Sequence, residues 1–281
     1  MSVKILIDSS SDISQEEAKE LNISVIPMEI TFEDEQFFDG IDLMPNEFYN
    51  KLENNSVLPK TSQINAFRWE NEFSKHTKNG DEVVAITISS KLSGTYNSAI
   101  QAAEKFKNKV FVVDSLNACI GERMICEYAI RLAKENKSAK EIAEALENKK
   151  SKVRVMAMIG TLEYLKKGGR ISSAVAFAGT LLSLKPLISV VDGEIKMIGK
   201  AMGTKKALIS LNKLIAEHNI DFEMPFGSLW SGIESTSLET YLKTNSPFAG
   251  VDINNISKHI LGATIATHIG PGAVGVSYFE K

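Results

Sequence analysis

The sequence has little cysteine, little proline and no excess of basic charge. Its 281 residues include 2 Cys and 7 Pro, and the formal net charge is −3. So few cysteines exclude a disulfide-based scaffold, and we expect Cys119 and Cys126 to be buried thiols. Without a basic surface the chain has no general means of holding nucleic acid. We therefore expect no nucleic-acid partner, and any charged ligand must be held by local groups.

Long apolar runs are also absent. The N-terminal run is too short for a signal peptide. The longest apolar stretch, residues 174–182, is about half of the ~20 residues that span a bilayer. We expect a cytoplasmic protein without a transmembrane segment, whose contact with a membrane is at most transient.

Several motifs of known chemistry are missing. There is no GxGxxG and no GxSxG, and the segment nearest to a P-loop, residues 193–200, continues with Ala201 where Ser or Thr would bind magnesium. The spacing of the histidines does not match a zinc site. These histidines are His76, His218, His259 and His268. The sequence therefore predicts no metal and no cofactor.

The pattern that is present indicates a two-domain α/β protein, since a chain of this length exceeds the usual size of one compact core. In the first half, β-branched runs at 3–7, 25–30, 82–88 and 109–113 alternate with amphipathic stretches, which predicts a parallel sheet covered by helices. The second half begins with a strand at 153–159 and has a hairpin turn at Asp192-Gly193, which indicates a mixed or antiparallel sheet. The predicted domains are residues 1–152 and 153–281.

Hydroxyl-rich turns are the main candidate binding groups. Three predicted strands end in the segments 8–12, 89–94 and 114–115, and ligands of open α/β sheets bind at the carboxyl ends of strands. Thr61-Ser62-Gln63 and Ser93-Gly94-Thr95 each lead into a predicted helix, where free N–H groups favour an anion such as a carboxylate. The alternative is that these hydroxyls only cap their helices.

Two further residues fit an acidic ligand. His268 is followed by Gly270-Pro271-Gly272, a tight turn that lets a ligand approach the backbone, although a histidine in a packed core is the alternative. Arg170 follows Gly168-Gly169, a pair typical of a helix end, and can bind a carboxylate or its phosphate derivative bidentately. Residues 171–182 predict a helix buried all round, which packs either against another helix or against an alkyl chain.

Six of these motifs, taken in order, resemble the DegV family over the whole chain. They are residues 8–12 (DSSSD), 59–63 (PKTSQ), 89–96 (SSKLSGTY), 114–115 (DS), 162–171 (LEYLKKGGRI) and 267–272 (THIGPG). The resemblance implies a fatty acid held between two domains, with its carboxylate at positions matching Thr61 and Ser93 and with His268 close by. It also implies a bacterial carrier that has no catalytic residues and presents the bound acid to an ATP-dependent fatty acid kinase subunit. The acyl phosphate made there feeds phospholipid synthesis.

The sequence departs from the family pattern at a few positions. Ile64-Asn65 stands where Pro-Ser is common, Ile269 where Thr is frequent, and Met202 where relatives often carry an Arg of a kinase-docking patch. These changes leave the hydroxyl pair in place.

The leading hypothesis is thus a fatty acid carrier rather than an enzyme. Its predicted ligand-binding residues are Thr61, Ser62, Ser93, Gly94, Arg170 and His268. The alternative is a serine esterase or thioesterase with Ser93 as nucleophile and His268 as base, for which the sequence nominates no orienting acid. A third reading, binding of another amphipathic acid, stays open.

Overall fold

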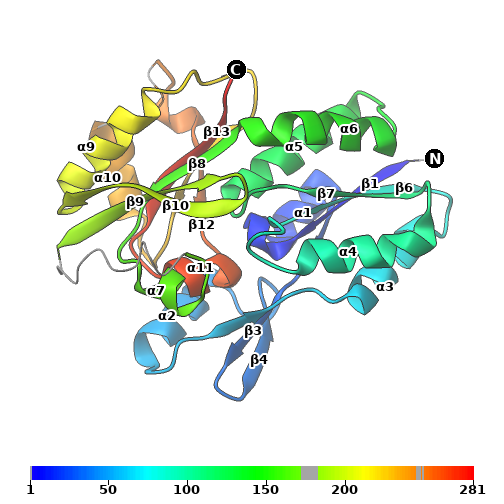
Figure 1. The fold of residues 1–281 in the computed structure, drawn as a ribbon, viewed down its shortest axis with the longest axis horizontal. Coiled ribbons are helices and arrows are strands. Elements are labelled where there is room, and N and C mark those ends of the chain that lie inside the picture. The colour runs from blue at the N-terminus through cyan, green and yellow to red at the C-terminus, as the bar shows by residue number, and fades with distance from the viewer. Residues whose placement is uncertain (1, 172–182, 245–247, 249) are drawn as a thin grey trace.

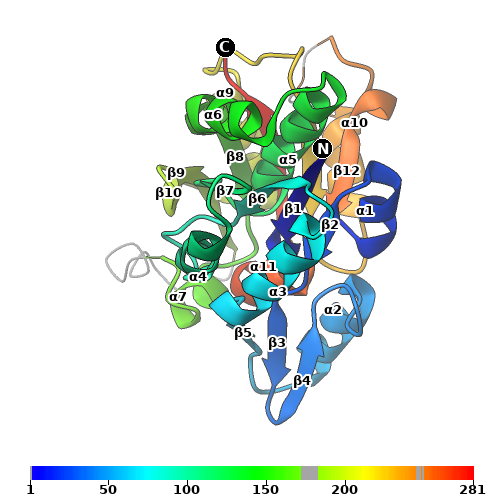
Figure 2. The same ribbon diagram turned by 90° about the vertical axis from the view of Figure 1, so that its right-hand side faces the viewer.

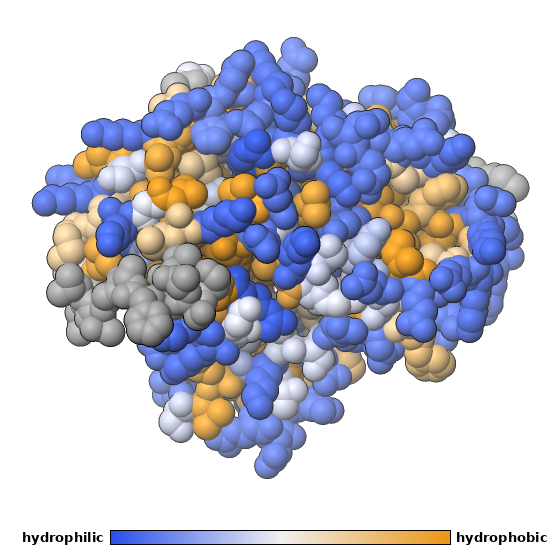
Figure 3. Space-filling model, viewed as in Figure 1, coloured by the Kyte–Doolittle hydropathy of each residue, from blue (hydrophilic) through white to orange (hydrophobic). Residues whose placement is uncertain are grey.

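The computed structural model describes residues 2–171, 183–244, 248 and 250–281, which form three sheets and their covering helices (Figure 1). Most of the predicted buried helix, residues 172–182, lies outside this described part of the chain. Figure 3 shows a mostly hydrophilic surface with separate hydrophobic patches. Within the described residues, no helix has the length and apolar character needed to cross a membrane.

The first sheet is parallel, as predicted. Across the sheet its strands are β2 (Ser24–Ile26), β1 (Val3–Asp8), β6 (Glu82–Thr87) and β7 (Val110–Asp114). Helices α3 (Ala66–Thr77) and α4 (Thr95–Ala103) pack on one face, and α5 (Ile120–Lys134) and α6 (Ala139–Lys149) on the other. The central strands are therefore buried on both faces, which explains their continuous β-branched runs. Ser138 caps α6 in a capping box with Glu141, and Ser14 caps α1 (Gln15–Leu21) by accepting from the Glu17 N–H.

The predicted strand at 25–30 is wrong as a single element. The chain leaves the parallel sheet after Ile26 and continues as β3 (Glu29–Phe32), which pairs antiparallel with β4 (Glu35–Phe38) and β5 (Lys60–Ser62). Pro27 stands at the break, where its missing N–H and fixed φ interrupt strand pairing. This small sheet projects beside α2 (Pro45–Asn54), which has Pro45 at its first position (Figure 2).

The second half of the chain builds a mixed sheet, which confirms the predicted fold class. Its strands, in spatial order, are β10 (Glu194–Met202), β9 (Leu184–Val191), β8 (Val153–Met158), β13 (Val274–Phe279), β11 (Phe226–Trp230) and β12 (Ser257–Ile260). All neighbours pair antiparallel except β11 and β12. The predicted hairpin turn is present, with φ of 51° at Asp192 and 81° at Gly193. Helices α9 (Thr204–Ile215) and α10 (Thr236–Thr244) cover one face, and the short α7 (Glu163–Lys167) and α11 (Ala263–Ile269) lie at the joint with the first half (Figure 1).

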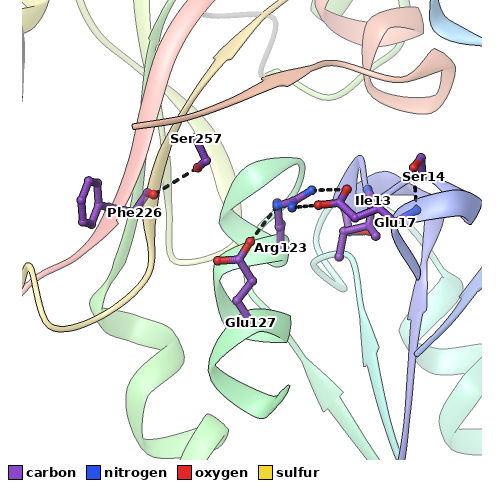
Figure 4. Close-up of polar contacts among 8 residues, drawn as sticks. Ile13, Ser14, Glu17, Arg123, Glu127, Phe226 and Ser257 are labelled. Atoms are coloured by element: carbon purple, nitrogen blue, oxygen red, sulfur yellow. Dashed lines mark hydrogen bonds and ion pairs between the residues drawn. The ribbon is translucent and has the colours of Figure 1, made fainter. Parts of the chain in front are cut away.

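Helix α5 connects the two halves of the molecule. One face packs on the parallel sheet, and Val153 and Phe279 from the mixed sheet belong to the same hydrophobic cluster. Arg123 of α5 donates from Nε to Glu127 at 2.8 Å and from Nη1 to Glu17 of α1 at 2.9 Å (Figure 4). Cys126 is buried on the same helix, and Cys119, just before it, is also a buried free thiol, as predicted. The domain boundary after residue 152 stays a prediction.

Candidate functional site

A cavity of about 230 Å³ lies between the two halves, and all six predicted ligand-binding residues contribute to its wall. Most of the lining is apolar and comes from the mixed sheet, from α11 and from the loop that follows β6. Typical members are Ile88, Leu92, Val155, Ala157, Ile188 and Ile265. The wall therefore combines a long apolar surface with a group of polar residues that is small and local, which is the usual composition of a site for an amphipathic ligand.

Thr61 and His268 form the first polar contact of this wall. Thr61 lies on β5 and His268 in the last turn of α11, and Thr61 Oγ1 lies 2.9 Å from His268 Nε2. Burial, together with the nearby positive charge of Arg170, lowers the pKa of His268 from 6.5 to about 4. The imidazole is thus neutral at pH 7, and the pair offers hydrogen-bonding groups without a second positive charge.

Ser93 and Gly94 form the second polar contact, at the start of α4. Ser93 Oγ lies 3.0 Å from Thr95 Oγ1 and accepts a hydrogen bond from the Thr95 backbone N–H. Gly94 is the N-cap residue, and a Cβ there would lie 2.0 Å from Gln63 Oε1, so the glycine lets the Gln63 side chain cross the helix end. Gln63 then donates to Ser98 Oγ at 3.1 Å. Gln63 also lines the cavity. The sequence analysis predicted its neighbours Thr61 and Ser62 as ligand-binding residues, but not Gln63.

Arg170 brings a positive charge to the same wall. It follows a Schellman-type end of α7, in which the Arg170 N–H donates to Leu165 O and the Gly169 N–H to Lys166 O, and Gly169 has a φ of 69°. The expected helix end at the paired glycines is therefore present. The guanidinium donates to the carbonyl oxygens of Leu92 and Gly168 at 3.1 and 2.5 Å. Both acceptors are neutral, so these bonds leave its charge uncompensated.

The predicted turns differ from expectation in two details. Residues 61–63 lead into α3, but Thr61 does not lie at its N-terminus, because Lys60–Ser62 pairs with β3 as a strand and Asn65 caps α3 by accepting from the Arg68 N–H at 3.0 Å. Gly270, which has a positive φ, is not among the residues that line the cavity. A Cβ at Gly270 would lie 2.3 Å from Tyr164 Cδ2, so the glycine makes room for the Tyr164 ring. The helix-terminus argument holds only for Ser93-Gly94.

The Asp and Ser clusters at the carboxyl ends of the strands have a structural use. Asp8 accepts from the Ile88 and Ser10 N–H groups at 2.8 and 3.0 Å, and Asp114 accepts from the Leu116 N–H at 2.9 Å. Neither aspartate lines the cavity. Of the three predicted strand-end segments, only 89–94 contributes to the cavity wall, through Leu92, Ser93 and Gly94. Buried backbone donors of the adjoining loops take up the carboxylates of Asp8 and Asp114.

The cluster at residues 8–12 contacts a carboxyl of α5, that of Glu122, which we infer to be protonated. Ser10 Oγ lies 2.5 Å from Asp8 Oδ1 and 2.6 Å from Glu122 Oε2, yet a hydroxyl has one proton to donate. One of the two acids must therefore donate to Ser10. Burial raises the pKa of Asp8 to about 6, and burial together with the charge of Asp8 raises the pKa of Glu122 well above its usual range. We assign the proton to Glu122.

Two aspartates hold α11 in place, Asp12 of the predicted 8–12 cluster and Asp39, which the sequence analysis did not single out. Asp39 accepts from the Ala263 N–H at 3.0 Å and from Thr264 Oγ1 at 2.6 Å, and Asp12 accepts from the Gly262 N–H at 2.8 Å. Both aspartates come from the first half of the chain, whereas α11 belongs to the second. Asp39 precedes a glycine and resembles an ordinary turn in the sequence, so no local signal marks it.

Ser93 and His268, the two residues of the esterase alternative, bond to different partners. Among the described residues no hydrogen bond joins Ser93 to His268, because the Ser93 hydroxyl bonds Thr95 and His268 Nε2 bonds Thr61. His268 Nδ1, where a triad would place an acid, is buried and has no partner within the described part of the chain. Across the same residues, no cluster of His, Cys, Asp and Glu is arranged to hold a metal ion.

A protein-family model and a relative of similar length both match nearly the whole chain. The family model described as "Uncharacterised protein, DegV family" matches residues 2–281. A DegV domain-containing protein of Caldanaerobacter subterraneus subsp. tengcongensis is 33% identical over 283 residues, which cover 99% of this chain and 99% of that protein.

Two solved structures of DegV proteins have the same overall fold as this chain. A DegV family protein from Thermus thermophilus, whose structure is described as showing fatty acid binding, superposes with a TM-score of 0.89 at 30% identity and covers 100% of both chains. DegV of Bacillus subtilis, described as a fatty acid binding protein, superposes with a TM-score of 0.83 at 28% identity, again over 100% of both chains. Since the family model and these relatives match essentially the whole length, the chain belongs to the DegV family.

Proposed function

We propose that this protein binds one long-chain fatty acid, with its carboxylate at Thr61, Ser62, Ser93 and Gly94 and its tail in the apolar cavity. His268 and Arg170 complete the head-group site. One observation supports this most directly: hydroxyls from β5 and from the start of α4 line the same cavity, whose remaining wall is mainly apolar. The relatives from Thermus thermophilus and Bacillus subtilis, described as fatty acid binding, support the same ligand class.

Burial of the tail is the main source of affinity. Each methylene removed from water contributes ~0.8 kcal/mol, so a tail of about fifteen carbons contributes on the order of 10 kcal/mol before the costs of association. The head group then needs only enough hydrogen bonds to offset its desolvation. Neutral hydroxyls and one nearby cation meet that need.

We further propose that the protein is a cytoplasmic carrier and not an enzyme. It would present the bound carboxylate to a separate ATP-dependent fatty acid kinase, whose acyl phosphate product enters phospholipid synthesis. The sequence has no nucleotide-binding loop of its own. Met202, at the position where relatives often carry Arg, is 47% exposed and leaves that part of the docking surface uncharged.

Mass spectrometry of the protein purified from cells tests ligand binding. Release under denaturing conditions should give about one long-chain acid per chain. A pocket that is empty and also refuses added fatty acid contradicts the proposal.

Handover needs a separate assay. The loaded protein is mixed with a fatty acid kinase and ATP, and acyl phosphate is trapped with hydroxylamine as the hydroxamate. Hydroxamate that forms only when both proteins are present supports the carrier role. Hydroxamate formed without the kinase would indicate an enzyme.

A further inference from the structure

Two carboxylates of the first half of the chain meet at the N-terminus of α11, a helix of the second half. Asp39 accepts from the Ala263 N–H at 3.0 Å and from the Thr264 N–H and hydroxyl at 3.2 and 2.6 Å. Asp12 accepts from the Gly262 N–H at 2.8 Å. We call Asp12 and Asp39 the aspartate clamp. Figure 1 shows α11 at the joint between the two halves, which is where the clamp acts.

Gly262 is the point on which the two carboxylates converge. A Cβ at this position would lie 3.2 Å from Asp12 Oδ1 and 3.3 Å from Asp39 Oδ1. The φ of Gly262 is −71°, which any residue adopts, so the backbone conformation does not require a glycine here. The missing side chain instead lets both carboxylates reach N–H groups that have no partner within the helix.

Keeping these carboxylates together has a cost. Burial raises the pKa of Asp39, and burial together with the charges of Asp39 and Asp8 raises that of Asp12, although Arg123 partly offsets the effect. Asp12 Oδ2 is buried and has no hydrogen-bond partner among the described residues. Buried polar groups that a protein keeps at such a cost are typical of functional positions.

The clamp itself does not line the fatty acid cavity, but the helix that it holds does. Neither aspartate is part of the wall, and Gly262 and Ala263 are not part of it either. Helix α11 has only 7 residues, so its position depends on contacts with its surroundings. The wall residues that α11 and the residue before Gly262 supply are Leu261, Thr264, Ile265, His268 and Ile269.

We propose that Asp39 and Asp12 are positioning residues for fatty acid binding, which act through α11 and touch no part of the ligand. This inference rests on the proposed function and deepens it. The ligand and the clamp favour the same docked position of α11, so each strengthens the other. The apparent affinity is then proportional to the fraction of molecules in which α11 is docked.

The binding test compares two clamp variants with a control on another helix. Asp39→Asn keeps the shape of the side chain and removes its charge, so the dissociation constant for palmitate should rise about tenfold. Gly262→Ala pushes both carboxylates away by a few tenths of an ångström and should raise it to a smaller extent. Ser138→Ala removes the cap of α6, which does not line the cavity, and should lower stability without changing palmitate affinity.

A second measurement needs no ligand. Burial, and then the charge of Arg170, lower the pKa of His268 to about 4, and NMR titration of the imidazole measures this value in the folded protein. Asp39→Asn should move the pKa of His268 up towards 6.5, because a loosened α11 exposes the ring to water. Ser138→Ala should leave it in place, since a general loss of stability does not change the environment of the ring in the native state.

Hydrogen exchange tests the reciprocal effect. The Gly262 and Ala263 N–H groups are bonded to the clamp and lie outside the cavity wall. Palmitate should slow the exchange of both amides in the wild-type protein, and should slow it less in Asp39→Asn.

The outcomes separate this inference from the proposed function. If the wild-type protein does not bind palmitate, the proposed function itself fails. If it binds palmitate and both clamp variants bind with the same affinity, the positioning role is wrong and the proposed function stands. An unchanged pKa of His268 in Asp39→Asn, or an equal loss of affinity in Ser138→Ala, would also overturn the positioning role.

Discussion

Replacing Thr61 with valine removes one hydroxyl and keeps the shape of the side chain. Thr61 Oγ1 lies 2.9 Å from His268 Nε2 on the cavity wall. In the proposed complex the hydroxyl would donate to the carboxylate and accept from the imidazole N–H, with His268 as the Nε2–H tautomer. Thr61→Val therefore leaves one carboxylate oxygen and one buried N–H without a partner.

The expected loss of affinity follows from the carboxylate oxygen, because the imidazole loses Thr61 as a partner in both the free and the bound protein. An unsatisfied buried polar group costs ~1 to 3 kcal/mol, so the dissociation constant for palmitate should rise by about 5- to 150-fold. Titration calorimetry on delipidated protein measures this change. The free protein also loses the Thr61–His268 bond, so its unfolding free energy should fall by ~1 kcal/mol.

A matched variant separates binding from stability. Thr77 is buried on α3 and donates to Phe73 O at 2.8 Å, but it does not line the cavity. Thr77→Val should lower stability by a similar amount and leave palmitate binding unchanged. Unchanged affinity in Thr61→Val, or an equal loss in Thr77→Val, would refute the assignment of Thr61 to the head group.

Three other outcomes are expected. Ala157→Phe fills part of the cavity, so competition assays should show loss of long-chain binding while short acids still bind, and unchanged long-chain affinity would place the tail elsewhere. The pKa of His268 is lowered to about 4, so the unfolded chain takes up this proton near pH 6.5 while the folded protein does not. This contribution to stability is present above pH 6.5 and is lost as the pH falls towards 4; His268→Gln should flatten that part of the urea-unfolding profile, and an unchanged slope contradicts it. Glu122→Gln should change the unfolding free energy at pH 7 by less than about 1 kcal/mol, because the carboxyl that faces Ser10 is already protonated; a loss of several kcal/mol would show that it is ionised.

The sequence predicted elements whose signals are local. The hairpin at Asp192-Gly193 depends on the conformational preference of a few neighbouring residues, and it is present. The two sheet types were predictable from local signals as well. Continuous β-branched runs indicated the parallel sheet, whose strands are buried on both faces, and the hairpin turn indicated antiparallel pairing in the second half. Ser93-Gly94 was correctly placed at a helix start.

The errors concern partners that are distant in the chain. Thr61 was expected to lie at a helix N-terminus, but residues 60–62 pair with β3 as an edge strand before α3 begins, and that pairing is set by tertiary context. The Asp8 cluster matched the pattern of a binding loop, but the donors that use it, such as the Ile88 N–H, lie about 80 residues away in the sequence. A single sequence carries no direct signal for such pairings.

Helix α11 shows why the site depends on the assembled molecule. It has only 7 residues, too few for a stable isolated helix, and it carries His268 in its last turn. Its first turn is fixed by Asp39 and Asp12 from the other half of the chain, at 2.6 to 3.2 Å. The Thr61–His268 contact therefore forms only when the two halves are docked. This dependence also explains why the hydroxyl turns at Thr61 and Ser93, taken one at a time, were also consistent with simple helix caps. The six motifs taken in order indicated a single binding site.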